Sequence, residues 1–247
     1  MNLDRVRASP ICTVIGAILI AALGVSAGAL ADDAVAPAAT PSPQPTSAPA
    51  PPAAPPPSAA VAPPVMVPIE QLMSIGPLPD LVQGSPSASI TIVEYASMTC
   101  AHCAAFHETT WPELKAKYID TGRAKFILRE FPLDPLATAG FMLARCAGPD
   151  KRNLLVDDLF SQQKSWAFVD KPIEPLLAIV KQIGMSQTDF ETCLRNQDLY
   201  DQVNQSRERA AEAFNIDSTP TFFVNGRKLS GEMAIADFDR VIDPLAK

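Results

Sequence analysis

The sequence predicts an α/β protein in which a block of helices interrupts one mixed sheet. A run rich in β-branched residues at 89–96 predicts a buried strand, and 124–131 predicts a second strand beyond an intervening helix. After a long helical stretch come a short strand at 221–224 and the hairpin signal Asn225-Gly226. A strand–helix–strand order favours a parallel pair, and a hairpin adds antiparallel strands, so the sheet is expected to be mixed.

Residues 1–31 have the features of an export signal. Arg5 and Arg7 precede an uncharged apolar run at 11–30. The segment Ala29-Leu30-Ala31 at its end has the small-x-small form of a signal-peptidase site. An uncleaved membrane anchor is the alternative, because a run of about 20 apolar residues is long enough to span a bilayer.

Residues 32–68 form a Pro/Ala-rich linker. The stretch 34–68 carries no charge and holds 13 of the chain's 25 prolines, so it is expected to be a disordered spacer. Low complexity without a role is the alternative. The rest divides into a first part of the sheet domain at 69–134, an inserted helical domain at 135–198 and a second part at 199–247.

The helices follow from apolar periodicity, caps and breakers. A helix is expected at 101–120, with a joint or kink at Pro112 because proline lacks the N–H group that a helix interior needs. Ser186 is a candidate N-cap, and Gly184 ends the preceding helix. The other helices are expected at 136–147, 149–163, 173–183, 187–197, 199–214 and 234–245.

Charge and cysteine content narrow the functional classes. The net charge is −7 and no basic block occurs, which argues against nucleic acid as a partner. Of the five cysteines, Cys12 lies in the export signal and Cys100, Cys103, Cys146 and Cys193 remain. An even number of cysteines in an exported chain fits an oxidising compartment.

The segment Cys100-Ala101-His102-Cys103 is the candidate catalytic centre. It follows a strand and opens a helix, where unpaired N–H groups and the helix dipole favour a thiolate at Cys100. His102 can add a positive charge, and Cys103 can resolve a mixed disulfide on Cys100. This thiol–disulfide chemistry needs no cofactor and no metal. The alternatives are a static disulfide or half of a zinc site, for which His107 is among the few further ligands.

Three segments in order carry a resemblance to the DsbA-like thiol:disulfide interchange proteins. They are YASMTCAHC at 95–103, FPL at 131–133 and STPTFFVNG at 218–226. The resemblance covers about residues 70–245 and implies a thioredoxin-like fold with an inserted all-helical domain. It implies a periplasmic, monomeric oxidoreductase that acts on unfolded or reduced exported proteins and has a membrane-bound reoxidising partner. Ala101 stands where well-studied members have proline, which leaves the oxidising strength open.

The resemblance also assigns supporting residues. Pro220 matches the family's cis-proline, and Thr219 before it would lie beside the cysteines, pair with an extended substrate and tune the nucleophile. Glu94 matches a buried acid that relays the proton of Cys103. An exposed strand residue is the alternative for Glu94, and Lys125 on the next strand is a candidate partner for a buried one.

Other residues are interpreted more plainly. Cys146 and Cys193 fall on helices of the inserted block, where a structural disulfide or two free thiols are both open, and export favours the disulfide. His107 shares a helix face with Trp111 and is interpreted as a packed residue.

Two competing functions remain open. One is a disulfide isomerase or reductase of the same fold. The other is a metal-binding chaperone that uses Cys100 and Cys103, and Met98 is the only nearby residue that could add a ligand to such a metal site.

Overall fold

The computed structural model describes residues 65–245, and the expected export signal and most of the linker lie outside this part. Within the end of the expected linker, residues 65–67 pair with the hairpin at 221–230 instead of forming a disordered spacer. The amide of Val67 donates to the carbonyl oxygen of Gly226 at 2.8 Å, and Met66 forms a bridge with Arg227. A Cβ atom at position 226 would lie 2.1 Å from the carbonyl oxygen of Val67, so this turn requires glycine.

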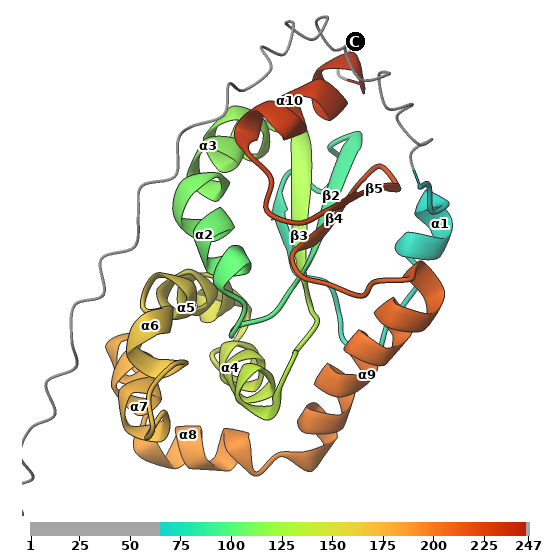
Figure 1. Ribbon diagram of the computed structural model, residues 1–247. Coiled ribbons are helices and arrows are strands. Elements are labelled where there is room, and N and C mark those ends of the chain that lie inside the picture. Colours follow the sequence, from blue (N-terminus) through green and yellow to red (C-terminus); the bar gives the residue numbers. More distant parts are fainter. Residues whose placement is uncertain (1–64, 246–247) are drawn as a thin grey trace, which may run out of the picture. The chain divides into compact units, whose positions relative to one another are not determined.

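The predicted mixed sheet is confirmed, with five strands in the order β1-β3-β2-β4-β5 (Figure 1). Strand β2 pairs in parallel with β3 and antiparallel with β4, and the outer pairs β1–β3 and β4–β5 are also antiparallel. The strands are β1 (Val82–Gly84), β2 (Ile90–Ala96), β3 (Ala124–Glu130), β4 (Thr221–Val224) and β5 (Arg227–Ser230). Strand β1 was not predicted, because its three residues are too few for an alternating pattern to be recognised.

Helices surround the sheet. They are α1 (Ile69–Leu72), α2 (Ala101–Thr109), α3 (Trp111–Leu114), α4 (Pro135–Cys146), α5 (Pro149–Ser161), α6 (Gln163–Trp166), α7 (Ile173–Gln182), α8 (Gln187–Leu194), α9 (Gln197–Phe214) and α10 (Ile235–Ile242). A π-helical turn, Lys115–Ile119, follows α3, and a 3-10 turn, Asp243–Leu245, follows α10. Within residues 65–245, no helix combines the length and the apolar character that crossing a membrane requires.

The helix expected at 101–120 is divided. Helix α2 ends at Thr109, and α3 begins at Trp111 with Pro112 in its first turn. Proline cannot donate the hydrogen bond that would continue α2, so the chain restarts its helix there. The short helix α1 was not predicted, and the helix expected at 149–163 ends at Ser161 before α6 begins.

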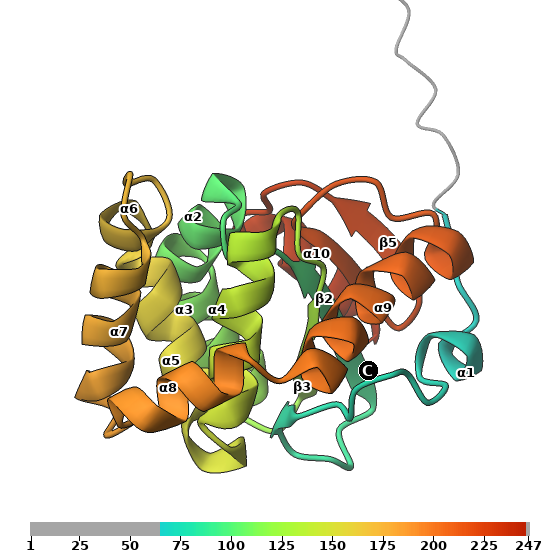
Figure 2. The same cartoon turned by 90° about the horizontal axis from the view of Figure 1, so that it is seen from below.

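Strand β2 is buried on both faces, and its alternation decides what each side chain meets. Ile92 belongs to a core shared with α2, α3, α10 and the helical block, whereas Val93 and Tyr95 pack with α1 and the end of α9. Figure 2 shows α9 passing from the helical block to the sheet. Because side chains alternate, Glu94 lies on the face of Ile92, under α2.

A buried ion group holds the helical block against β3. The side chains of Glu130 and Arg152 are each 1% exposed, and their Oε1 and Nη2 atoms are 2.8 Å apart. Arg145 on α4 contacts the same oxygen at 2.7 Å. Burial alone would raise the pKa of Glu130, but the two guanidinium groups outweigh it and lower this pKa. The carboxylate therefore stays charged and ties α4 and α5 to the sheet.

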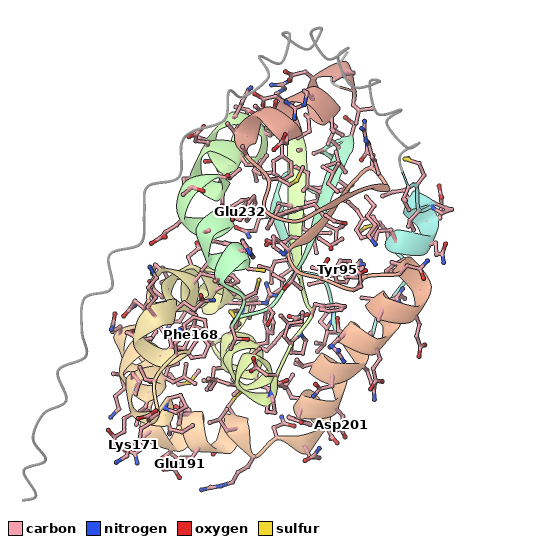
Figure 3. The ribbon with its side chains drawn as sticks, in the orientation of Figure 1. Tyr95, Phe168, Lys171, Glu191, Asp201 and Glu232 are labelled. Carbon is pink, nitrogen blue, oxygen red and sulfur yellow. A yellow bond between two sulfur atoms is a disulfide. The ribbon has the colours of Figure 1, made fainter. Side chains whose placement is uncertain are left out.

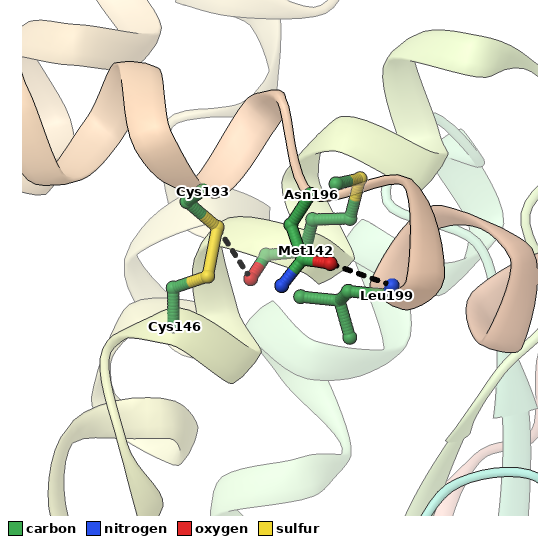
Figure 4. Close-up of a disulfide and its surroundings, with 5 residues drawn as sticks. All are labelled: Met142, Cys146, Cys193, Asn196 and Leu199. Carbon is green, nitrogen blue, oxygen red and sulfur yellow. Dashed lines mark hydrogen bonds between the residues drawn. A yellow bond between two sulfur atoms is a disulfide. The ribbon is translucent and has the colours of Figure 1, made fainter.

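A disulfide joins α4 to α8 inside the helical block (Figure 4). The sulfur atoms of Cys146 and Cys193 are 2.11 Å apart and the Cα atoms 6.1 Å apart. Ser186 caps the start of α8 by accepting a hydrogen bond from the amide of Asp189, at 3.1 Å. The bridge lies apart from Cys100 and Cys103, which are both free thiols.

We expect the double substitution Cys146→Ser with Cys193→Ser to lower the free energy of unfolding by about 4 kcal/mol, because the bridge closes a long loop. Urea unfolding with and without the substitutions measures this loss. Thiol–disulfide exchange at Cys100 should continue at its original rate. Loss of that exchange in a variant that remains folded would show that the bridge takes part in the chemistry.

Candidate active site

The two cysteines lie where strand β2 passes into helix α2. Cys100 is the N-cap residue of α2, and Cys103 lies one turn further in. At the end of β2, the hydroxyl of Ser97 accepts a hydrogen bond from the amide of Leu133 at 3.2 Å, which ties this turn to the loop after β3. The thiol of Cys100 lies at the start of α2, just beyond the end of β2, whereas the thiol of Cys103 is buried in the core.

The Cys100 thiol lies in a site that favours its ionised form. The hydrogen bond from Cys103 is the largest influence and lowers the pKa of Cys100. Burial opposes it, and hydrogen bonds from the Thr219 side chain and from the backbone of Cys103 and His102 lower the pKa further, to about 5. Backbone donors at a helix start act in the same direction as the helix dipole. Cys100 is thus a thiolate at neutral pH.

The Cys103 thiol has the opposite character. It is fully buried, and burial raises its pKa well above the ordinary value. The hydrogen bond to Cys100 and the negative charge of Glu94 raise the pKa of Cys103 further. A pair of neighbouring thiols with such different acidities separates the roles of nucleophile and resolving thiol.

Thr219 and Pro220 face the cysteines from the loop before β4. The peptide bond between them is cis. In the thiol form, Cys100 donates through its Sγ atom to the carbonyl oxygen of Thr219, at a distance of 3.3 Å. The Thr219 hydroxyl is buried and has no other partner among the described residues, so it is free to donate to the Cys100 thiolate and thereby lower the pKa of Cys100.

His102 lies on the outer side of α2. Its Nδ1 atom is 3.0 Å from Oε2 of Glu232, which Figure 3 labels beside this helix. The hydrogen bond to Glu232 raises the pKa of His102, and the charge of Cys100 raises it further. Because the imidazole is largely exposed, its contact with Glu232 is screened by solvent.

Glu94 is fully buried on β2 and contacts His107 on α2. The Oε2 atom of Glu94 lies 2.9 Å from Nε2 of His107. The prediction that Lys125 is the partner of Glu94 is wrong. Lys125 lies on the opposite face of the sheet and donates to the carbonyl oxygen of Pro86. The β3 residue opposite Glu94 is Leu128.

Sequence reasoning missed a buried contact from the helical block. Gln163, at the start of α6, is 3% exposed. Its Nε2 atom donates to the carbonyl oxygens of Met98, at 2.8 Å, and Cys100, at 3.0 Å. It thereby holds the backbone that carries the nucleophile. A lone glutamine on a helix gives no local sign of such a role.

The packed interpretation of His107 is confirmed in part. Its ring stacks on Phe160 with 4.3 Å between ring centroids, and Trp111 lies near it. The contact with Glu94 was not predicted, because helix periodicity shows which residues share a face but not what that face meets. In residues 65–245, no cluster of three or more His, Cys, Asp or Glu side chains is arranged to hold a metal ion.

We expect absorbance at 240 nm to show Cys100 of the reduced protein ionising with a midpoint near pH 5. The Cys100→Ser variant should show no thiolate until well above pH 9, because burial raises the pKa of Cys103. The pKa of Cys100 is about 5 in the folded protein and about 9 in the unfolded chain. The thiolate therefore contributes its full stabilisation of the reduced protein above about pH 9. This contribution is lost as the pH falls through about 5. A midpoint near pH 9 would contradict the arrangement of donors described here.

We expect Gln163→Leu to lower the free energy of unfolding by about 1–3 kcal/mol, because the carbonyl group of Met98 loses its side-chain donor and that of Cys100 keeps only the Ala104 amide. Gln162→Leu is the matched control, since that neighbouring side chain donates no hydrogen bond to the catalytic turn. Urea unfolding of the reduced proteins compares the two. Equal stability in both variants would rule out a holding role for Gln163.

Comparison with known proteins identifies the family. A family model described as Thioredoxin matches residues 78–244. A Rickettsia conorii protein named as a putative protein-disulfide oxidoreductase is 34% identical over 165 residues, covering 66% of this chain and 59% of the relative. A protein of the same name from Rickettsia bellii is 35% identical over 148 residues, covering 60% of this chain and 57% of the relative. The chain thus spans less than three fifths of the length of these curated relatives.

Solved structures show the same architecture. The crystal structure of Wolbachia pipientis alpha-DsbA1 is 31% identical, with a TM-score of 0.67, and the match covers 73% of this chain and 96% of that one. A protein-disulfide isomerase from Novosphingobium aromaticivorans, at 21% identity and a TM-score of 0.60, shares the fold; the match covers 69% of this chain and 100% of that one. The expected thioredoxin-like fold is confirmed, and the chain belongs to the thioredoxin family, among its DsbA-like thiol–disulfide interchange proteins.

Proposed function

We propose that this protein is a thiol–disulfide oxidoreductase that introduces disulfide bonds into exported proteins through Cys100 and Cys103. The observation that carries the proposal is the opposite acidity of the two thiols. The pKa of Cys100 is lowered to about 5, whereas burial raises that of Cys103 well above its ordinary value. One sulfur is therefore suited to exchange with substrates, and the other to close the disulfide from within.

The reaction follows from this asymmetry. A substrate thiolate attacks Sγ of Cys100 in the oxidised protein, the bond to Cys103 breaks, and Cys103 leaves as a thiolate that takes up a proton. A second substrate thiolate then attacks the substrate sulfur of the mixed disulfide and releases Cys100 as a thiolate. The substrate has lost two electrons and gained a disulfide, and the protein holds two reduced cysteines.

The acidity of Cys100 also supports the direction of transfer. A thiolate that is stabilised in the reduced protein makes the reduced form more favourable, so the disulfide is readily given away. Cys100 is also the better leaving group in a mixed disulfide, which favours release of the oxidised substrate. This argues for an oxidase over a reductase of the same fold.

A groove beside Cys100 supports unfolded chains as the substrate class. The cavity, of about 320 Å³, lies between α2 and α6, and Ala101, Ala104 and Phe160 form part of its lining. Phe168, labelled in Figure 3, also lines it and is 60% exposed. Such an apolar wall near the nucleophile suits the apolar segments that unfolded proteins expose. The backbone of Thr219 offers an extended segment a place to pair.

The setting is inferred from the N-terminal sequence. The export signal at 1–31 and the spacer at 32–64 argue for a periplasmic protein, released or held by an uncleaved anchor. We infer a monomer, reduced exported proteins as substrates, and a membrane-bound disulfide donor that restores the Cys100–Cys103 bond. Glu94 is proposed as the buried acid that exchanges a proton with Cys103.

Substitution of each cysteine tests the assignment of roles. In the Cys103→Ser variant, the Cys100 thiolate should attack disulfides already present in exported proteins, with one substrate thiolate leaving. The mixed disulfides should accumulate, because the resolving thiol is missing. The Cys100→Ser variant should form none, because the remaining thiol is buried and protonated. Non-reducing electrophoresis after an acid quench measures both. Equal trapping by the two variants would contradict the proposed roles.

The redox potential separates an oxidase from a reductase. We expect the full chain to have a potential well above about −270 mV, the value of the reductant thioredoxin, because the thiolate stabilises the reduced form. Equilibration with glutathione buffers measures it, and oxidation of a reduced, unfolded protein is the matching activity. A potential as low as that of thioredoxin would overturn the oxidase assignment.

A further inference from the structure

His107 joins a buried acid to one at the protein surface. Its Nε2 atom lies 2.9 Å from Oε2 of Glu94, and its Nδ1 atom lies 3.6 Å from Oδ1 of Asp157 on α5. The side chain of Glu94 is fully buried and that of His107 is 4% exposed, whereas that of Asp157 is 52% exposed. The imidazole ring thus lies between the sheet face beneath the cysteines and the solvent.

The outer side of this ring opens on a groove. A cavity of about 430 Å³ between α2, α3 and α5 has His107 and Asp157 in its lining. The other charged groups around it are Glu108 on α2, Lys115 after α3, and Asp158 on α5. Phe160 stacks on the ring and fixes its plane. The groove therefore meets only the edge of the imidazole: Nδ1 of His107 is itself buried, and Glu94 behind it has no solvent contact.

Opening of the disulfide creates a need for a proton in this region. Cys103 leaves as a thiolate, and its side chain is fully buried, so solvent cannot protonate it directly. Glu94 is close enough for its charge to raise the pKa of Cys103. The Oε1 atom of Glu94 has no hydrogen-bond partner among the described residues, so it is available to receive and pass on a proton. Glu94 in turn needs a group from which it can take a proton.

We propose that His107 is this source: it supplies, through Glu94, the proton that Cys103 takes up when its bond to Cys100 opens, and Asp157 holds the ring in place. This proposal rests on the proposed oxidoreductase function. The Nε2 proton of the imidazolium passes to Glu94, and one proton passes from Glu94 to the Cys103 thiolate. When a disulfide donor reoxidises the protein, Cys103 returns the proton along the same path. Protons and electrons therefore balance over a cycle.

The ionisation of His107 fits this role. Burial alone would lower the pKa of His107, but the charge of Glu94 and the contacts with Asp157 raise it to about 9. The ring is therefore charged at neutral pH, with a proton on Nε2 facing Glu94. Glu108 and Asp158 add negative charge around the groove, and Lys115 adds positive charge. The assistance from His107 should be lost as the pH rises through about 9.

The test is the rate at which reduced glutathione opens the disulfide in the oxidised full chain, with free Cys103 counted after an acid quench. Asp157→Asn should slow this second-order rate by about three- to tenfold at pH 7, because the ring loses its support. Loss of a negative charge alone would make the Cys103 thiolate a better leaving group and speed the reaction. Proton supply by His107 through Glu94 (the relay) therefore predicts a slower rate in Asp157→Asn, whereas a simple charge effect predicts a faster one.

Asp158→Asn is the matched control, because it removes the same charge from the same groove without contacting His107. Asp158→Asn should leave the rate unchanged within about twofold, because Asp158 makes no ion pair or side-chain hydrogen bond with His107 and its charge lies at a groove that solvent reaches. A rate in Asp157→Asn that equals that of Asp158→Asn, or exceeds that of the original protein, would overturn the relay. Asp157 is half exposed, so its substitution should not prevent folding.

The pH profile gives an independent readout. After correction for the ionisation of glutathione, the rate of the original protein should fall near pH 9 as His107 loses its proton. His107→Gln should be slower by about tenfold or more and should lack this step. A step that persists in His107→Gln would also overturn the relay. Failure of the original protein to form any mixed disulfide on Cys100 would instead reject the oxidoreductase function on which the relay rests.

Discussion

The short turn between β2 and α2 is the constraint on which the rest of the site depends. It places Cys100 at the first turn of a helix, where backbone N–H groups and the helix dipole favour negative charge. The helical repeat then carries Cys103 inward to a position without solvent contact. One local geometry thus produces two neighbouring thiols of opposite acidity, and the remaining contacts adjust this difference.

The alternation of side chains along β2 decides which groups support the thiols. Glu94 shares the face of Ile92 and therefore lies under α2, where it meets His107. A shift of one residue would have turned it toward Tyr95 and the end of α9. The same alternation on β3 directs Glu130 into the helical block, where two arginines keep it charged. Two buried acids on one sheet face therefore have different partners, a histidine for Glu94 and two arginines for Glu130.

Much of the fold could be predicted from local signals. Strand patterning located β2 and β3, Ser186 and Gly184 marked helix ends, and Pro112 predicted the division between α2 and α3. The strand β1 escaped detection because it is short. In the site, the Cys100–Cys103 motif was visible because its chemistry is local in sequence. Contacts such as that of His107 with Glu94 depend on how a helix packs on a sheet. Lys125 does lie on the strand next to Glu94, but its pairing with Thr91 places it on the opposite face, and this register cannot be derived from the sequence alone.

The hydrogen bonds of Gln163 have a consequence for how reactivity can vary in this chain. This residue lies 63 positions after Cys100 and reaches it through a main-chain oxygen rather than through the sulfur. The inserted helices are therefore part of the frame that sets the angle of the nucleophile. Sequence change within them can retune the exchange chemistry while the four-residue motif stays the same, so two relatives with identical motifs need not be equally strong oxidants.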